Sequence, residues 1–268
     1  MKPAANVMRW LARGEPQLPR DDGWLSPVET ARAATMRFTK RRTEFLVARW
    51  TAKQAIAGYL QRDIHPARIE VRHHITGAPE AYLDGKPLDI GISLTDRADW
   101  AVCLLGGAPG AVGCDLELVE PRSAAFVRHF FTSTEQQAIH DDLTANLLWS
   151  AKESVLKVLR TGLRRDTRTV EVVAEPGGAE WTSLTACTIE GTIYPGWWRR
   201  IGDFILTVAA DHPAPAPKPL EQPSTLASAT PRHSWLAQPV TRPSCGQVMP
   251  SVVGAGRPEF GRAPGPAR

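Results

Sequence analysis

Prolines are concentrated at the end of the chain, where 12 of the 23 lie in residues 212–268. Proline cannot donate a backbone hydrogen bond, and this segment has few apolar residues from which to build a core. We therefore expect residues 212–268 to form a disordered Pro/Ala-rich tail, with the folded unit ending near Ala210. The remaining length suits one large domain or two small ones.

The basic residues are also unevenly distributed along the chain. The formal net charge is +4, and residues 212–268 alone, with 6 Lys or Arg against 2 Asp or Glu, carry that excess. The folded part is therefore neutral. A nucleic-acid-binding function, which requires a basic surface, loses its support.

Composition excludes several other classes of protein. No run approaches the ~20 apolar residues that a membrane helix needs, and the N-terminus lacks the apolar segment of a secretory signal. The four cysteines are far apart and form no CxxC pair, which argues against a zinc site or a disulfide framework. We expect a cytoplasmic protein with no membrane partner.

The glycines Gly106, Gly107 and Gly110 divide the folded part into two segments. Apolar spacing predicts a long helix and two strands before them, and two helices among four strands after them. The expected helices are 43–60, 125–140 and 146–159, and the expected strands are 69–73, 100–105, 111–119, 169–173, 184–190 and 203–209. Each segment mixes helices with short strands, so the fold class is α+β.

Two carboxylates lie on the strand expected at 111–119. Because strand side chains alternate between faces, Asp115 and Glu117 share one face, and Cys114 and Leu116 point the other way. Neighbouring carboxylates repel each other, and a divalent cation with oxygen ligands would relieve that repulsion. The alternative is an edge strand whose polar face meets water, and this segment alone favours the alternative.

A stripe of functional side chains follows on the helix expected at 146–159. Trp149, Glu153 and Lys157 recur every four residues and so share a face, with Lys152 beside Glu153. A Glu–Lys pair four residues apart is also a common surface device worth a few tenths of a kcal/mol. The pair alone therefore does not establish a site.

Three motifs occur in one order and at a characteristic spacing, and together they are specific. They are Gly113-Cys114-Asp115-Leu116-Glu117, Phe130-Phe131-Thr132-Ser133-Thr134-Glu135, and Trp149-Ser150-Ala151-Lys152-Glu153 continuing to Lys157, and Arg160-Thr161-Gly162-Leu163 follows the last of them. This series resembles the 4′-phosphopantetheinyl transferase superfamily, of the surfactin-synthetase-activating type. The resemblance is strong from Gly77 to Gly162, weaker for Arg41 to Leu60, and absent beyond Ala210.

The resemblance implies a fold and a reaction. The family fold is a pseudo-dimer of two similar α/β halves, with the active site between them. The halves would be residues 1–106, on the coenzyme A nucleotide side, and 107–211, with the metal and the catalytic helix. The implied reaction transfers 4′-phosphopantetheine from coenzyme A to a serine of an apo acyl or peptidyl carrier protein, as in secondary-metabolite biosynthesis. It is magnesium-dependent and releases adenosine 3′,5′-bisphosphate.

The resemblance also assigns roles in the second half. Asp115, Glu117 and Glu153 would hold Mg²⁺ against the pyrophosphate, with Glu153 or a water on the metal accepting the serine proton. Lys157 would neutralise charge on the phosphates, and Lys152 would do the same or orient Glu153. Positioning and charge neutralisation are most of what phosphoryl transfer requires.

In the first half, the resemblance assigns nucleotide-binding residues. Arg49, on the helix at 43–60, and Arg42, just before it, would bind the 3′-phosphate and adenine region of coenzyme A. The alternative for both is that they only make the helix soluble. Thr95 would keep a hydroxyl toward the nucleotide phosphates.

Two departures from the family pattern affect the same region. Ala78 stands where the pattern has a lysine after Gly77, and Lys86 from the following loop is the candidate substitute. Asp96 replaces a histidine that would face a phosphate, and a carboxylate there repels the phosphate. These departures keep open an alternative, a non-catalytic member of the fold that binds a carrier protein.

The partner surface is expected after Glu117. Carrier proteins present a short acidic helix with an apolar spot, and Phe126, beside a polar turn, could be exposed as an anchor for it. Phe131 is expected in the core. We expect a monomer that acts without nucleic acid.

Overall fold

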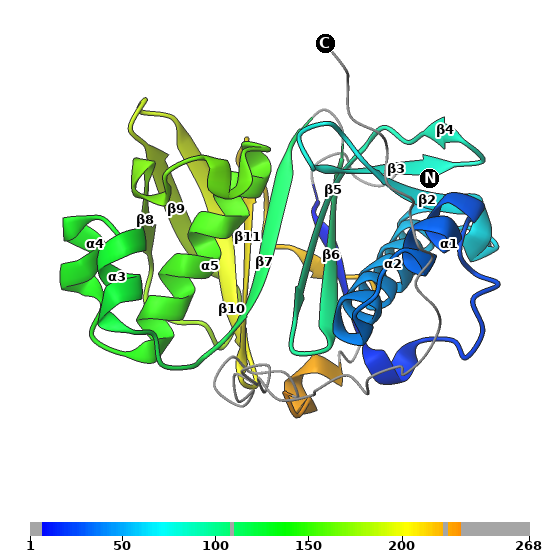
Figure 1. The fold of residues 1–268 in the computed structure, drawn as a ribbon. Helices are drawn as coiled ribbons and strands as arrows, with labels where there is room; N and C mark the ends of the chain where they lie inside the picture. Colours follow the sequence, from blue (N-terminus) through cyan, green and yellow to red (C-terminus); the bar gives the residue numbers. More distant parts are fainter. Residues whose placement is uncertain (1–6, 108–109, 222–224, 232–268) are drawn as a thin grey trace, which may run out of the picture. The chain divides into compact units, whose positions relative to one another are not determined.

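The chain forms a mixed α+β fold with three sheets in the part that the computed structural model describes, residues 7–107, 110–221 and 225–231 (Figure 1). The fold class expected from the sequence is thus confirmed. The helices are α1 (Pro27–Ala34), α2 (Thr39–Leu60), α3 (Ala124–Phe130), α4 (Ser133–Ala138) and α5 (Asp142–Val158). The strands are β1 (Arg9–Gly14), β2 (Ile69–His73), β3 (Pro79–Leu83), β4 (Lys86–Pro87), β5 (Ile90–Arg97), β6 (Trp100–Gly107), β7 (Val112–Leu118), β8 (Val170–Ala174), β9 (Thr182–Thr188), β10 (Ile193–Ile201), β11 (Phe204–Ala210) and β12 (Lys218–Pro219).

The two larger sheets each carry one long helix. The first sheet has the strand order β12-β1-β6-β5, the second has β7-β11-β10-β9-β8, and a small third sheet has β2-β3-β4. Helix α2 lies against the first sheet and α5 against the second (Figure 1). None of the helices in the described ranges is long and apolar enough to cross a membrane.

Alternating side chains on the buried strands build separate cores. On β6, Val102 and Leu104 lie in a core shared with the second sheet, whereas Cys103 and Leu105 pack beneath α2. The same alternation on β11 directs Leu206 to the shared core and Ile205 toward α5. The layers therefore follow the order α2, first sheet, second sheet, α5. Strands buried on both faces need continuous apolar sequence, which is why β6 and β11 were expected correctly.

Hydroxyl groups join the two large sheets at their meeting edges. The backbone N–H of Cys114 on β7 donates to Ser93 Oγ on β5 (3.0 Å). The N–H of Leu116 donates to Thr95 Oγ1 (3.1 Å). These bonds satisfy buried backbone donors of β7, so they hold the carboxylate-bearing strand beside β5.

Two buried ion pairs with matching connections anchor the long helices. Lys53 on α2 pairs with Glu29 (2.6 Å), and Lys152 on α5 pairs with Glu135 (2.7 Å). Each glutamate also closes a capping box at the start of a short helix and accepts a strand N–H, from Val71 and Val172 respectively. Each lysine donates to two carbonyls near the start of the next strand, at Pro66 and Ile69 or at Thr167 and Val170.

One helix expected from the sequence is interrupted and forms two helices in the structure. Residues 125–140 form α3 and α4, separated at Phe131, whose backbone is extended with φ −112° and ψ 149°. The break has a local cause, because Thr132 caps a new helix through a capping box with Glu135. The expectation of a continuous helix is therefore wrong.

The ordered chain continues past Ala210, contrary to expectation. Strand β12 adds to the edge of the first sheet parallel to β1, with the N–H groups of Lys218 and Leu220 donating to Met8 and Trp10 (2.9 Å each). Beyond it, Leu226 is fully buried in the core shared by the two large sheets. The two backbone donors and the buried Leu226 attach this proline-rich segment to the fold. The expectation of disorder for residues 232–268 stays a prediction, because these residues lie outside the part that the structure describes.

Candidate active site

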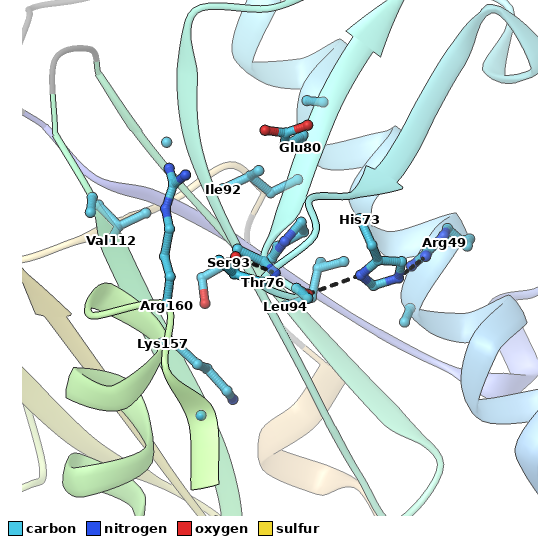
Figure 2. Close-up of a pocket in the computed structure, with 18 of the residues that line it drawn as sticks. Arg49, His73, Thr76, Glu80, Ile92, Ser93, Leu94, Val112, Lys157 and Arg160 are labelled. Atoms are coloured by element: carbon cyan, nitrogen blue, oxygen red, sulfur yellow. Dashed lines mark hydrogen bonds between the residues drawn. The ribbon is translucent and has the colours of Figure 1, made fainter. Parts of the chain in front are cut away.

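A cavity of about 610 Å³ opens between the end of α5 and the elements around α2, β3 and β5. Figure 2 shows Lys157 and Arg160 on one side of it and His73 and Arg49 on the other, with Ser93 of β5 between them. The volume falls in the range of small-molecule and cofactor sites.

The lining of this cavity is rich in cations. The basic side chains are Arg32, Arg41, Arg49, Lys157, Arg160 and Arg164, and the acidic ones are Glu44, Glu80, Asp89 and Asp96. This surplus of positive charge favours an anionic ligand.

A glycine brings the catalytic helix against the carboxylate strand. A Cβ on Gly113 of β7 would collide with the carbonyl oxygen of Ser154 on α5. Only glycine allows this close approach of the two backbones. It sets the α5 side chains Glu153 and Lys157 beside the neighbouring β7 residue Asp115.

Asp115 is buried and only half satisfied. Its Oδ1 accepts hydrogen bonds from Thr95 Oγ1 (3.1 Å) and Lys157 Nζ (2.8 Å). Its Oδ2 is buried and has no hydrogen-bond partner. Cys114 and Leu116 on the opposite face are in the shared core, so the alternation expected for this strand is confirmed and its water-facing alternative is wrong.

Glu153 lies close enough to Asp115 for the two carboxylates to repel each other. Its Oε1 is buried without a hydrogen-bond partner. Burial and the negative charge of Asp115 together raise the pKa of Glu153 to about 7. A carboxylate with this pKa can exchange a proton near neutral pH.

Glu117 is held by cations of the protein itself. Its Oε2 lies 3.2 Å from Arg97 Nε and 3.0 Å from Arg122 Nη2. The indole N–H of Trp149 donates to Oε1 (3.1 Å). Both oxygens of Glu117 are therefore already engaged, unlike those of Asp115 and Glu153.

The donor set suits a hard divalent cation at two of the three carboxylates. No group of three or more His, Cys, Asp or Glu among the described residues is arranged to hold a metal ion. However, magnesium is commonly held by one or two carboxylates plus substrate phosphates. Asp115 and Glu153 offer that, because each presents a buried oxygen without a partner. Glu117 would have to exchange its arginine partners to join them.

The two lysines of the helix motif point to different places. Lys157 lines the cavity and donates to Asp115 and to the Cys114 carbonyl (2.8 Å each). Burial lowers the pKa of Lys157, but the adjacent Asp115 carboxylate outweighs it and the net shift is upward, so the ammonium stays charged.

Lys152, in contrast, is fully buried in its pair with Glu135 and does not line the cavity. The expectation that it meets a phosphate or orients Glu153 does not fit this position, because a side chain that holds Glu135 and two carbonyls points away from the cavity.

The two arginines expected on the nucleotide side also differ. Arg49 lines the cavity and lies 2.7 Å from His73 Nε2. Burial lowers its pKa to about 10, so it remains a cation, and burial lowers the pKa of His73, which favours the neutral imidazole as acceptor. Arg42 instead forms an exposed ion pair with Asp22 (2.8 Å) and is not part of the lining.

The residues expected around the nucleotide phosphates are only partly brought together. Asp96, Gly77 and Ala78 line the cavity, whereas Thr95 is turned to Asp115 and Lys86 is exposed on β4. Burial, then the charge of Glu44, raises the pKa of Asp96 to about 6. Because Lys86 is exposed and does not line the cavity, it does not replace the missing lysine at Ala78.

Phe126 is not an exposed anchor. Its ring contacts Phe130 (4.7 Å between centroids), Trp149 (5.0 Å) and Phe131 (6.0 Å). Phe131 is in the core, as expected, with 1% exposure. The half-buried Phe126 thus belongs to an aromatic cluster beneath α3, and that expectation is wrong.

Some cavity residues gave no usable sequence pattern. His73 and Arg164 come from a strand end and from the turn after α5, and no motif singles out their role, whereas Arg160 belongs to the stretch up to Gly162 that carries the family resemblance. Their placement depends on the contact between elements far apart in the chain.

The class of protein follows from comparison of the chain with known protein families. Strand β7 carries Asp115 and Glu117 and packs against α5, which carries Glu153 and Lys157. These two elements form one wall of the basic cavity through Val112 and Lys157, and the three carboxylates themselves are not among its lining residues. Residues 111–209, which contain this wall, match the model of the 4′-phosphopantetheinyl transferase superfamily. This part of the chain is a domain of that superfamily. A comparison with curated proteins finds no match.

Proposed function

We propose that the protein is a surfactin-synthetase-activating type of phosphopantetheinyl transferase, which moves 4′-phosphopantetheine from coenzyme A to a serine of an apo carrier protein. One observation carries this proposal: in a domain of the superfamily, Lys157 lines a basic cavity and forms an ion pair with Asp115, whose negative charge also acts on Glu153. The cations of the lining suit the phosphates of coenzyme A.

The residues divide the work of the transfer. A Mg²⁺ ion held by Asp115 and Glu153, with Glu117 after release from its arginines, would supply positive charge to the pyrophosphate. Lys157 lies next to Asp115 and stays cationic, so it can stabilise negative charge on the transferred phosphoryl group. Glu153, or a water on the metal, would accept the serine proton.

We further propose that residues 1–106 and 107–211 are two related halves around this cavity. The matching ion pairs Lys53–Glu29 and Lys152–Glu135, with equivalent capping boxes and strand contacts, support it. The sequence alone supports a cytoplasmic, monomeric enzyme whose partners are a carrier protein and coenzyme A.

A second candidate is a non-catalytic protein that binds a carrier protein. The ion pairs of Glu117 with Arg97 and Arg122 favour it, since they occupy an expected metal ligand. Ala78 and Asp96 favour it as well.

One assay distinguishes the two. The protein is incubated with coenzyme A, Mg²⁺ and an apo carrier protein, and the carrier is weighed by mass spectrometry. We expect wild type to add phosphopantetheine, Asp115→Ala to lose at least a hundredfold in rate, and the exposed control Glu180→Gln to match wild type. An unmodified carrier that nevertheless binds the protein would favour the second candidate.

A further inference from the structure

Arg160 adopts a backbone conformation that ordinarily favours glycine. It follows the last turn of α5, and its φ is 56°. Helices often end with a glycine in this left-handed conformation, whereas a side chain there is strained. A strained residue that lines a cavity points to a functional role of its side chain.

The Arg160 side chain extends into the basic cavity. Figure 2 shows it running from the end of α5 past Val112, in the direction opposite to Lys157. Among the residues that the structure describes, no carboxylate forms an ion pair with it. Its charge is therefore available to a ligand.

A neighbouring arginine fixes Arg160 opposite the turn that contains Ala78. Arg164 Nη2 donates to the carbonyl oxygens of Thr76 (2.9 Å) and of Arg160 (3.1 Å). These bonds join the turn after α5 to the turn before β3, so Arg160 and Ala78 lie on the lining of one cavity. The cation that Ala78 cannot provide is thus present on the facing turn.

We propose that Arg160 binds a phosphate group of the nucleotide ligand, replacing a cation missing at Ala78. The identity of the ligand as coenzyme A rests on the proposed function. A guanidinium can hold two phosphate oxygens at once, which favours arginine over lysine. The phosphate is either the 3′-phosphate or the pyrophosphate, and the two can be distinguished by experiment.

A purely structural role makes a different prediction. Arg160 could interact only with the C-terminal end of the α5 dipole, as basic residues often do. In that case its replacement would change stability and leave ligand affinity unaltered. Gln61, which ends α2 with a φ of 51° and does not line the cavity, provides a matched control.

The test is calorimetric titration of wild type, Arg160→Gly, Arg160→Lys and Gln61→Gly with coenzyme A, dephospho-coenzyme A and adenosine. We expect Arg160→Gly to weaken coenzyme A binding about tenfold to a hundredfold, the range of a lost charge-assisted contact. The coenzyme A affinity of Arg160→Lys should lie between those of wild type and Arg160→Gly, and Gln61→Gly should bind like wild type. The affinity for adenosine should not change in any variant. Relief of the strained φ means that the melting temperature of Arg160→Gly is not lowered.

The dephospho ligand identifies the phosphate. If Arg160→Gly weakens both nucleotides equally, Arg160 binds the pyrophosphate, and if it weakens only coenzyme A, it binds the 3′-phosphate. Unchanged coenzyme A affinity, or an equal loss for adenosine, overturns the proposal. Arg160-dependent binding without transfer to a carrier would refute the proposed function alone, and a wild type that binds no nucleotide refutes both.

Discussion

Lys152 should be needed for stability and not for ligand binding. The Lys152→Met substitution keeps the length of the side chain and removes its charge. The ammonium is fully buried, lies 2.7 Å from Glu135, and donates to the Thr167 carbonyl (3.0 Å) and to that of Val170. Removing one partner of a buried ion pair costs about 3–5 kcal/mol, because the other charge remains buried. At roughly 2–4 °C per kcal/mol for a domain of this size, the melting temperature should fall by about 6–20 °C.

The measurement is urea unfolding at pH 7 of wild type, Lys152→Met, Glu135→Gln and the double variant. Because the two side chains contact each other, the double variant should lose less free energy of unfolding than the two single losses together. Lys53→Met provides a parallel case in the other pair and should lose a similar amount.

The competing interpretation gives the opposite result. If Lys152 met a phosphate, Lys152→Met would stay within about 1 kcal/mol of wild-type stability and would bind coenzyme A more weakly. That combination would show that the side chain faces the cavity.

Two further predictions concern the site and its surroundings. Glu153 has a pKa of about 7 against an ordinary 4.5, so its protonated form favours folding, and this contribution is complete below about pH 4.5 and is lost as the pH rises through 7. Glu153→Gln should therefore be more stable than wild type by about 3 kcal/mol at pH 8 and by little near pH 4.5, which urea unfolding at both values measures; an equal difference at the two would contradict the pKa. Phe126→Ala should lose about 2 kcal/mol of stability, less than the ~3–5 of a fully buried phenylalanine, and a thermal melt unchanged from wild type, together with a raised Michaelis constant for the carrier protein, would instead identify Phe126 as an exposed anchor.

Local patterns predicted the elements whose sequences follow a single periodicity. The strand expected at 69–73 coincides with β2, and the buried strands β6 and β11 were found from their apolar runs. Strand β10 was missed because Pro195 lacks a backbone donor and Gly196 lacks a side chain. Both residue types argue against assigning a segment to a central strand. Its neighbours β9 and β11 decide its conformation, since a Cβ at Gly196 would collide with Val208.

The candidate site was predictable where spacing determines direction. Glu153 and Lys157 are four residues apart on α5 and so share a face. Lys157 contacts Asp115, and the charge of Asp115 acts on Glu153. Lys152 precedes Glu153 by one residue and is rotated by about 100°, and this turns it to Glu135. The motif therefore places two adjacent residues on different sides of the helix. Their adjacency in the sequence does not reveal that they have different roles.

The prolines around β12 also protect the fold from association with other chains. Pro217 and Pro219 alternate with Lys218 and Leu220, whose N–H groups bond to β1. Proline has no N–H, so the outer side of β12 offers no donors at these two positions. An exposed sheet edge with free donors is a template for aggregation, and here the composition typical of a disordered segment gives the first sheet an edge on which a further strand cannot form a regular ladder.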